Sequence, residues 1–343
     1  MKYSKVYIEN YAYHDPEVFL TSDELEKRLS PVYNRLKLPF GRLELQTSIK
    51  TRGMWPVGTK PSSIATGAAI KALEKSTIDH SDIDLLIHSS VCRDYLEPST
   101  ASSIHYNLKL KPECMSFDLS NACLGFVNAI TVASDMIENG TIKTALIVTG
   151  ENAGPLIEET ITRLNQDMTL TRKTIKKFIA NLTIGSAGVA FILCHEDISS
   201  SGHLVLGGHS LTDSTASALC TGSGNADSLM METESEKLLH AGVTLAKQTW
   251  IGMQEKLSLK ESDFNHLICH QVGSAHRDLM YKELKLDIKK DHKTFDEYGN
   301  TGSAALPLTF VKAMESKRIK PGDNIALLGI GSGLHSIMLG VRI

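Results

Sequence analysis

The chain carries one helix–turn–strand pattern twice, and this repeat constrains the fold more than any other feature. Residues 74–87 (EKSTIDHSDIDLLI) align without a gap to residues 255–268 (EKLSLKESDFNHLI), a shift of 255 − 74 = 181 positions. Both segments leave a helix-like stretch at Glu-Lys and pass through Ser-Asp into an apolar run. Few aligned residues are identical, so a chance match in a short window is the alternative. The shared order of elements favours a duplication into two similar halves.

The apolar pattern predicts an α/β fold. Several runs are rich in Val, Ile and Leu, which is typical of strands covered on both faces. The predicted strands span 85–90, 114–118, 144–150, 188–194, 204–209, 266–270, 324–329 and 336–343. Helical patterns cover 64–75, 124–139, 234–255, 275–286 and 303–315. Because 343 residues exceed the usual size of one core, we predict two halves, 1–197 and 198–343, stacked as alternating helical and strand layers.

Composition and charge exclude several classes of protein. The chain is 42% hydrophobic and 22% charged, and its net charge of −3 provides no basic field for nucleic acid. No apolar run is long enough for a signal peptide or a membrane span, so we expect a cytoplasmic protein. The six cysteines lack the spacing of a disulfide framework and are expected to be reduced thiols.

The sequence predicts no metal site. It contains no Cys-x-x-Cys motif, which structural zinc sites commonly use. His266, His270 and His276 are close in sequence, but a strand followed by a helix is expected to scatter them.

Cys123 is the candidate nucleophile. It follows the extended-looking residues 115–118 and precedes the helical pattern at 124–139. A thiol on the first turn of a helix lies among unpaired N–H groups, which lower the thiol pKa and favour the nucleophilic thiolate. A lone buried cysteine is more often a small core residue, so the catalytic interpretation depends on further residues.

Three later segments complete the predicted site. His270 ends a predicted strand, Asn300 lies in the turn sequence Gly-Asn-Thr-Gly, and residues 329–333 read Gly-Ile-Gly-Ser-Gly. When Cys123 attacks an acyl thioester, its own N–H and one from residues 329–333 can stabilise the tetrahedral oxyanion. His270 and Asn300 can donate to the enolate oxygen of a second thioester, and His270 can also support the thiolate.

A helical, basic insertion near 157–180 breaks the symmetry of the repeat. Such a charge run is usually a solvated face. The functional alternative is that it caps the site and that Arg163, Arg172 and Lys173, with neighbouring lysines, bind the phosphates of coenzyme A or an acidic carrier protein.

These motifs resemble the β-ketoacyl-ACP synthase III branch of the thiolase superfamily over almost the whole chain. The segment 90–101 (SVCRDYLEPSTA) and the closing segment 326–334 (ALLGIGSGL) are similar to the OleA-type enzymes, which join two fatty acyl-CoA molecules head to head. The resemblance implies the thiolase fold with αβαβα layers and an acyltransferase that acts as a homodimer. It also implies that Cys123 is acylated, that His270 and Asn300 complete a triad, and that the Ser332 N–H joins the oxyanion hole.

Glu97 separates two mechanisms. Synthases that use malonyl units form their carbanion by losing carbon dioxide, whereas joining two ordinary acyl thioesters requires removal of an α-proton. A carboxylate in a dry tunnel is the expected base for that step. In the resembling enzymes this glutamate reaches across the dimer into the partner's site. The alternative for Glu97 is a solvated acid beside a proline.

Several other interpretations stay open. The main alternative activity is a decarboxylative synthase III that uses malonyl-ACP, and a catalytically idle partner subunit is a further one. Papain-like hydrolases share the order Cys, His, Asn, but their Cys-Gly-Ser-Cys-Trp context is absent. The condensation requires no cofactor beyond the coenzyme A or phosphopantetheine of its substrates.

Overall fold

The central sheet has one continuous strand order. In residues 1–224 and 229–343, which the computed structural model describes, nine strands follow the order β11-β12-β13-β8-β1-β7-β6-β4-β5. One half contains β1 (Val6–His14), β7 (Ala187–His195), β6 (Thr144–Glu151), β4 (Leu85–His88) and β5 (Met115–Asp118). The other half contains β8 (Leu204–Thr212), β13 (His335–Arg342), β12 (Asn324–Gly331) and β11 (His266–Cys269). The ladder between β1 and β8 pairs Tyr7 with Leu204, so the halves join at a short seam.

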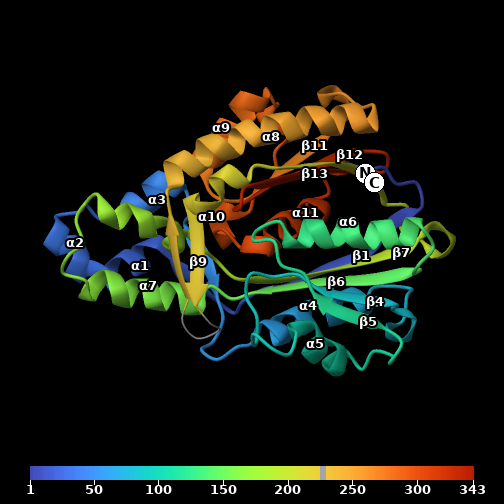
Figure 1. Ribbon diagram of the computed structural model, residues 1–343, viewed down its shortest axis with the longest axis horizontal. Coiled ribbons are helices and arrows are strands. Elements are labelled where there is room, and N and C mark those ends of the chain that lie inside the picture. The colour runs from blue at the N-terminus through green and yellow to red at the C-terminus, as the bar shows by residue number, and fades with distance from the viewer. Residues whose placement is uncertain (225–228) are drawn as a thin grey trace.

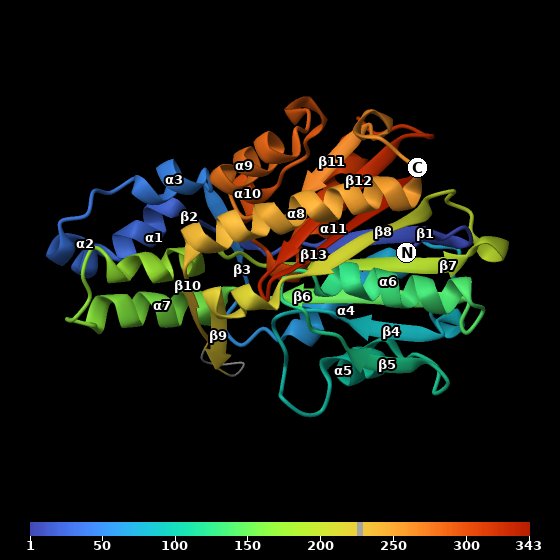
Figure 2. The same ribbon diagram turned by 45° about the horizontal axis from the view of Figure 1, so that its top comes forward.

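Helices cover both half-sheets and also fill the space between them (Figure 1). α4 (Pro61–Leu73) and α5 (Thr100–Leu108) cover one outer face, and α8 (Ser235–Leu257) and α9 (Ser274–Leu284) cover the other (Figure 2). α6 (Gly125–Glu138) and α11 (Ala305–Glu315) form the middle layer, where they contribute to one apolar core with strands of both halves. This arrangement confirms the predicted αβαβα layers.

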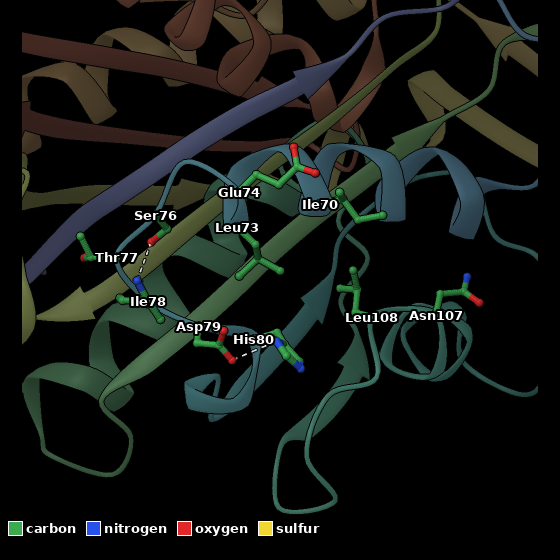
Figure 3. Close-up of a pocket in the computed structure, with 10 residues that line it drawn as sticks. All are labelled: Ile70, Leu73, Glu74, Ser76, Thr77, Ile78, Asp79, His80, Asn107 and Leu108. Carbon is green, nitrogen blue, oxygen red and sulfur yellow. Dashed lines mark hydrogen bonds and ion pairs between the residues drawn. The ribbon is translucent and has the colours of Figure 1, made fainter.

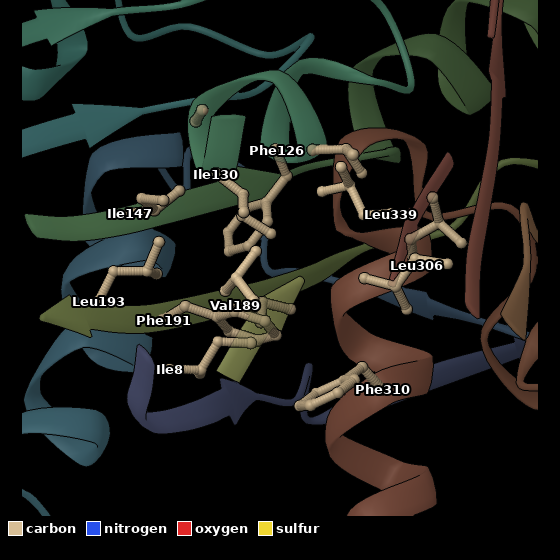
Figure 4. Close-up of a cluster of buried hydrophobic side chains, with 14 of the residues drawn as sticks. Ile8, Phe126, Ile130, Ile147, Val189, Phe191, Leu193, Leu306, Phe310 and Leu339 are labelled. Atoms are coloured by element: carbon tan, nitrogen blue, oxygen red, sulfur yellow. The ribbon is translucent and has the colours of Figure 1, made fainter. Parts of the chain in front are cut away.

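Aromatic side chains from different layers form the centre of that core (Figure 4). The ring of Phe191 on β7 lies 5.1 Å from the ring of Phe126 on α6 and 5.4 Å from that of Phe310 on α11. All three side chains are fully buried. Since α6 packs against strands on both sides, its buried residues surround much of the helix instead of forming one stripe.

The repeat found in the sequence is also present in the structure, both in the order of elements and in the way the strands pair. The short 3-10 helices η1 (His80–Asp82) and η5 (Glu261–Asp263) precede β4 and β11, and each second copy follows the first by 261 − 80 = 266 − 85 = 181 residues. β4 pairs in parallel with β6, and β11 pairs in parallel with β12. Residue 197 lies in η3 (Glu196–Ile198), between β7 and β8, and the domain division there stays a prediction.

No strand was predicted at the position of β1, although this strand lies near the middle of the sheet. Its sequence VYIENYAYH places Glu9 and Asn10 where an apolar run would be expected, and the ladder has a bulge between Ile8 and Asn10. The buried Glu9 carboxylate accepts the N–H groups of Ser200 at 2.7 Å and Ser201 at 3.2 Å. Because those donors lie 191 and 192 residues away, the local pattern could not reveal a buried strand.

A peripheral unit extends from one end of the layers. It has its own apolar core, to which α1 (Ser22–Arg28), α2 (Ser30–Leu36), α7 (Gly154–Gln166) and the 3-10 segment η2 (Thr174–Thr183) contribute. α3 (Arg42–Thr47), α10 (Phe295–Tyr298), the hairpin β9 (Cys220–Gly224) and β10 (Leu229–Thr233), and the pair β2 (Val18–Thr21) and β3 (Thr51–Met54) adjoin it. The predicted insertion at 157–180 is therefore helical, but only its first part is α-helix.

Replacing Phe191 by alanine should destabilise the protein by about 3–5 kcal/mol, because the change leaves a cavity between three layers. Urea unfolding followed by circular dichroism measures this loss. Leu45→Ala is the control, since Leu45 is 84% exposed and its removal should change the unfolding free energy by less than about 0.5 kcal/mol. Unfolding of Phe191→Ala at the wild-type urea concentration would contradict the described core.

Candidate active site

Cys123 lies in a tight turn directly before α6. Ala122 has a φ of 45°, a left-handed conformation that few non-glycine residues adopt. The Leu124 N–H donates to the Asn121 carbonyl at 2.9 Å and closes the turn. The sequence predicted that Cys123 lies on the first turn of the helix. α6 begins at Gly125, so Cys123 instead precedes the helix.

The Asn300 loop contacts the beginning of α6. Ser303 Oγ accepts the Phe126 N–H at 2.9 Å, and the same oxygen would lie 3.1 Å from a Cβ at Gly125. Glycine therefore lets the two segments approach closely. Asn300 itself is held by its backbone, because its N–H donates to the Thr183 carbonyl at 2.8 Å.

The glycine-rich connection between β12 and β13 lies on the other side of the Cys123 turn. A Cβ at Gly331 would come within 3.0 Å of Leu124 Cγ and 3.5 Å of the Leu124 nitrogen. His270 follows β11, and its N–H donates at 3.0 Å to Leu328 on the neighbouring β12. The structure thus brings together the backbone segments that carry Cys123, His270, Asn300 and Ser332.

The Cys123 thiol is a weak acid in the free protein. Burial, with smaller effects from the nearby carboxylate of Glu151 and the thiol of Cys220, raises its pKa to about 12. The expectation of a lowered thiol pKa is wrong, since burial, and to a smaller extent the Glu151 carboxylate, disfavours the thiolate. The thiol is therefore protonated near neutral pH.

His270 is a neutral imidazole. Burial, with a smaller effect from His276, lowers its pKa to about 3, so it is uncharged near neutral pH. The rings of His270 and His276 are 6.3 Å apart, which corrects the expectation that these two histidines are scattered. His266 has a different partner from these two histidines: its Nδ1 lies 3.0 Å from Nε2 of His292. A neutral imidazole supplies one donor and one acceptor nitrogen.

The Asn300 side chain is oriented by its own loop. Its Oδ1 accepts the Gly302 N–H at 3.1 Å, which leaves the Nδ2 amide group as the donor. Asn300 is 8% exposed and His270 is 4% exposed, so water competes little for the polar atoms of either side chain.

Glu97 lies at the exposed tip of a loop whose base is fixed. The Asp94 N–H donates to Thr100 Oγ1 at 3.1 Å, and the Asp118 carboxylate accepts the N–H groups of Thr100 and Ala101 at 2.8 Å. In the described part of the chain, Glu97 makes no hydrogen bond or ion pair. The base of the loop is fixed while the Glu97 carboxylate is left available.

The basic residues of the insertion divide into paired and exposed side chains. The Arg172 guanidinium donates to the Leu36 and Lys37 carbonyls at 2.7 and 2.6 Å, at the end of α2. Arg163 stacks 4.8 Å from the centre of the Phe178 ring and lies 3.9 Å from a Glu232 oxygen. Lys173 is exposed. Two of the three predicted phosphate ligands therefore have partners inside the protein. Lys173, the third of them, is the side chain most available to bind a ligand.

Glu151, at the end of β6, is a residue of the site that the sequence analysis missed. It is 4% exposed, and its Oε1 accepts the N–H groups of Val91 and Ser303, each at 3.0 Å. The available signal was a carboxylate at the end of the apolar run TALIVTGE, where a buried charge is unusual.

A surface hollow of about 380 Å³ lies elsewhere, between α4 and the end of α5 (Figure 3). Its lining residues include the paired side chains of Asp79 and His80, and none belongs to the segments around Cys123. Within residues 1–224 and 229–343, no cluster of three or more His, Cys, Asp or Glu is placed to hold a metal ion. None of the helices described there combines the length and the apolar character that a membrane crossing needs.

Comparisons with known proteins agree with this geometry. Residues 117–168 match the family model of 3-oxoacyl-(acyl-carrier-protein) synthase III, and residues 254–343 match the model of its C-terminal part. The chain is 35% identical to the acyl-CoA:acyl-CoA alkyltransferase of Shewanella oneidensis over 100% of both chains. It is 26% identical to the β-ketoacyl-acyl-carrier-protein synthase III of Clostridium tetani over 97% of both chains.

Solved structures give the same relationship. A crystal structure of a Xanthomonas campestris OleA variant superimposes with a TM-score of 0.95 at 36% identity, covering 100% of this chain and 98% of that one. A second, with bound lauric acid and lauroyl-CoA, gives a TM-score of 0.94 at 36% identity, covering 99% of this chain and 100% of that one. The full-length identity and the shared fold show that the chain belongs to the acyl-CoA:acyl-CoA alkyltransferase (OleA) family of thiolase-superfamily condensing enzymes.

Proposed function

We propose that this acyltransferase joins two fatty acyl-CoA molecules by a Claisen condensation without decarboxylation. The observation that carries the proposal is the convergence of the Cys123 turn, the end of β11 and the Asn300 loop in a chain that belongs to the alkyltransferase family. A relative crystallised with lauroyl-CoA supports a long-chain acyl-CoA as the substrate class. Such substrates place the reaction in the cytoplasm, and the reaction needs no cofactor beyond their coenzyme A.

The first step is acyl transfer to Cys123. Its sulfur attacks the thioester carbonyl, the bond from that carbon to the CoA sulfur breaks, and the thiol proton moves to the departing CoA. The N–H groups of Cys123 and Ser332 are the proposed donors to the tetrahedral oxyanion. Because one thioester replaces another, the step needs little net energy, but it requires the proton to move with the sulfur exchange.

The second step forms the carbon–carbon bond. Glu97 of the partner subunit removes an α-proton from a second acyl-CoA, and His270 and Asn300 donate to the resulting enolate oxygen. The carbanion attacks the acyl carbonyl on Cys123, the carbon–sulfur bond breaks, and the departing cysteine sulfur takes up the proton that Glu97 removed. The product is a β-ketoacyl-CoA, or a β-keto acid after hydrolysis of that thioester.

An exposed apolar surface beside Glu97 supports a homodimer. Leu96 is 93% exposed and Tyr95 is 49% exposed at the loop tip. β5 is the edge strand of the sheet, and its Met115 is 51% exposed. An unpaired edge strand next to exposed apolar residues is a typical surface for a second copy, which would cover it and receive the Glu97 loop.

A decarboxylative reaction with malonyl-ACP is the second candidate, because the matching family models describe synthase III enzymes. In that case Glu97 would not act as a base. Lys173, with weaker contributions from Arg163 and Arg172, is the proposed contact for the phosphates of CoA or of a carrier protein. An idle partner subunit is the least supported alternative, since the segments of the complete site are all in place.

Cys123→Ala should abolish covalent loading of an acyl group while preserving the fold, because alanine fits the same turn. Mass spectrometry of the intact protein after mixing with lauroyl-CoA measures the adduct, and circular dichroism checks the fold. Cys114→Ala is the matched control, since Cys114 is a buried thiol outside the site and its loss should leave loading intact. An acyl group still attached to Cys123→Ala would refute the assignment of the nucleophile.

His270→Ala and Asn300→Ala should each reduce condensation by roughly 100- to 1,000-fold, the scale of losing one oxyanion donor. Both should still accept an acyl group on Cys123, because the N–H groups proposed for that step remain. Single-turnover assays of loading and product formation separate the two steps. Near-normal condensation by both variants would show that other groups hold the enolate oxygen.

Glu97→Gln should load an acyl group and then stop before the carbon–carbon bond forms. Mixing its protomers with Cys123→Ala protomers should restore about a quarter of wild-type activity, because about half of the dimers are mixed and each holds one complete site. Product formation after co-expression measures this complementation. If the mixture stays inactive while Glu97→Gln alone is inactive, Glu97 acts within its own subunit or only in folding.

A further inference from the structure

Glu151 is a buried carboxylate to which the proposed mechanism assigns no step. It is 4% exposed, and among the described residues it forms no ion pair with a lysine or arginine. Burying an unpaired carboxylate is costly unless hydrogen bonds compensate it. A buried carboxylate at the end of β6 is therefore expected to have a specific structural or chemical role.

The hydrogen bonds of Glu151 join two loops of the site. Oε1 accepts the N–H of Val91, in the segment that leads to Glu97, at 3.0 Å. The same oxygen accepts the N–H of Ser303, in the Asn300 loop, also at 3.0 Å. Gly302, with a φ of +57°, lets that loop lie against the carboxylate, because a Cβ there would be 3.1 Å from Oε1.

Ser303 extends this connection to the nucleophile. Its Oγ accepts the Phe126 N–H at 2.9 Å, one turn after Cys123. One carboxylate oxygen thus links the segments that carry the proposed base, the enolate donor and the beginning of α6. Losing it would free both loops at once, since the buried N–H of Ser303 and the partly buried N–H of Val91 would lose their acceptor.

The carboxylate also acts electrostatically on nearby thiols. It raises the pKa of Cys123 and the pKa of Cys92, in each case after the larger effect of burial. Among the described residues, the thiol of Cys220 on β9 is the other titratable group that raises the pKa of Cys123. A negative charge beside the thiol favours the protonated form of that thiol.

We propose that Glu151 is a positioning residue that holds the Asn300 loop and the segment leading to Glu97 on one carboxylate beside Cys123. Its effect on condensation rests on the proposed function, whereas its effect on the thiol does not. Two kinds of measurement therefore separate a failure of this inference from a failure of the proposed function.

The charge is tested with Glu151→Gln, whose amide oxygen can still accept both N–H groups. The rate of Cys123 alkylation by iodoacetamide, followed by peptide mass spectrometry as a function of pH, should shift to lower pH, because the thiolate no longer faces an anion. Acyl loading from lauroyl-CoA should persist. An alkylation profile that coincides with the wild type would overturn the electrostatic part of the proposal.

The positioning is tested with Glu151→Ala, which removes the acceptor. It should reduce condensation by about 100-fold or more, while loading of Cys123 falls by less than about tenfold. Restoration of condensation by Glu151→Gln would assign the loss to the hydrogen bonds. Equal rates of condensation in Glu151→Ala and wild type would overturn the positioning role, and if Glu151→Ala does not fold, the glutamine variant still tests the charge.

Glu26→Gln is the matched control. Glu26 is 1% exposed and accepts the Leu43 N–H at 2.8 Å and the Tyr33 hydroxyl at 3.1 Å, all within the peripheral unit. Its neutralisation should leave the alkylation profile of Cys123 and the condensation rate unchanged. A shift as large as that of Glu151→Gln would mean that any buried charge has this effect, which would overturn the inference.

Discussion

The packing of α6 and α11 between the two half-sheets is the constraint on which the site depends. Both helices are buried in one core, and the hydrogen bond between the Phe126 N–H and Ser303 Oγ shows that they begin side by side. Cys123 lies just before one helix and Asn300 lies just before the other. The proposed nucleophile and the proposed enolate donor therefore lie at similar points, each before the middle-layer helix of its half.

Burial gives this site its chemical character. The Cys123 thiol and the His270 imidazole are both neutral in the free protein, because a charge on either would lose its hydration. The thiolate fraction rises with pH toward the raised pKa, so a substrate-coupled proton transfer is needed near neutrality. Neutral donors suit the later enolate, since they stabilise its oxygen without attracting a competing anion.

The sequence predicted those parts of the molecule whose signal is local. Continuous apolar runs gave β4, β6 and β7, and turn residues beside Cys123 and Asn300 marked the site. β1 was not predicted, because the hydrogen-bond donors that allow Glu9 to be buried come from residues near 200. Glu151 and the neighbouring rings of His270 and His276 escaped for the same reason, since their roles arise from contacts between distant segments.

The most direct test of the account supplies lauroyl-CoA with deuterium at its α-carbon as the only thioester and analyses the product by mass spectrometry. The account predicts a β-keto product that has lost one deuterium from the carbon that forms the new bond, because a base removes that atom. Formation of a product only after malonyl-CoA or malonyl-ACP is added, with release of carbon dioxide, would contradict it.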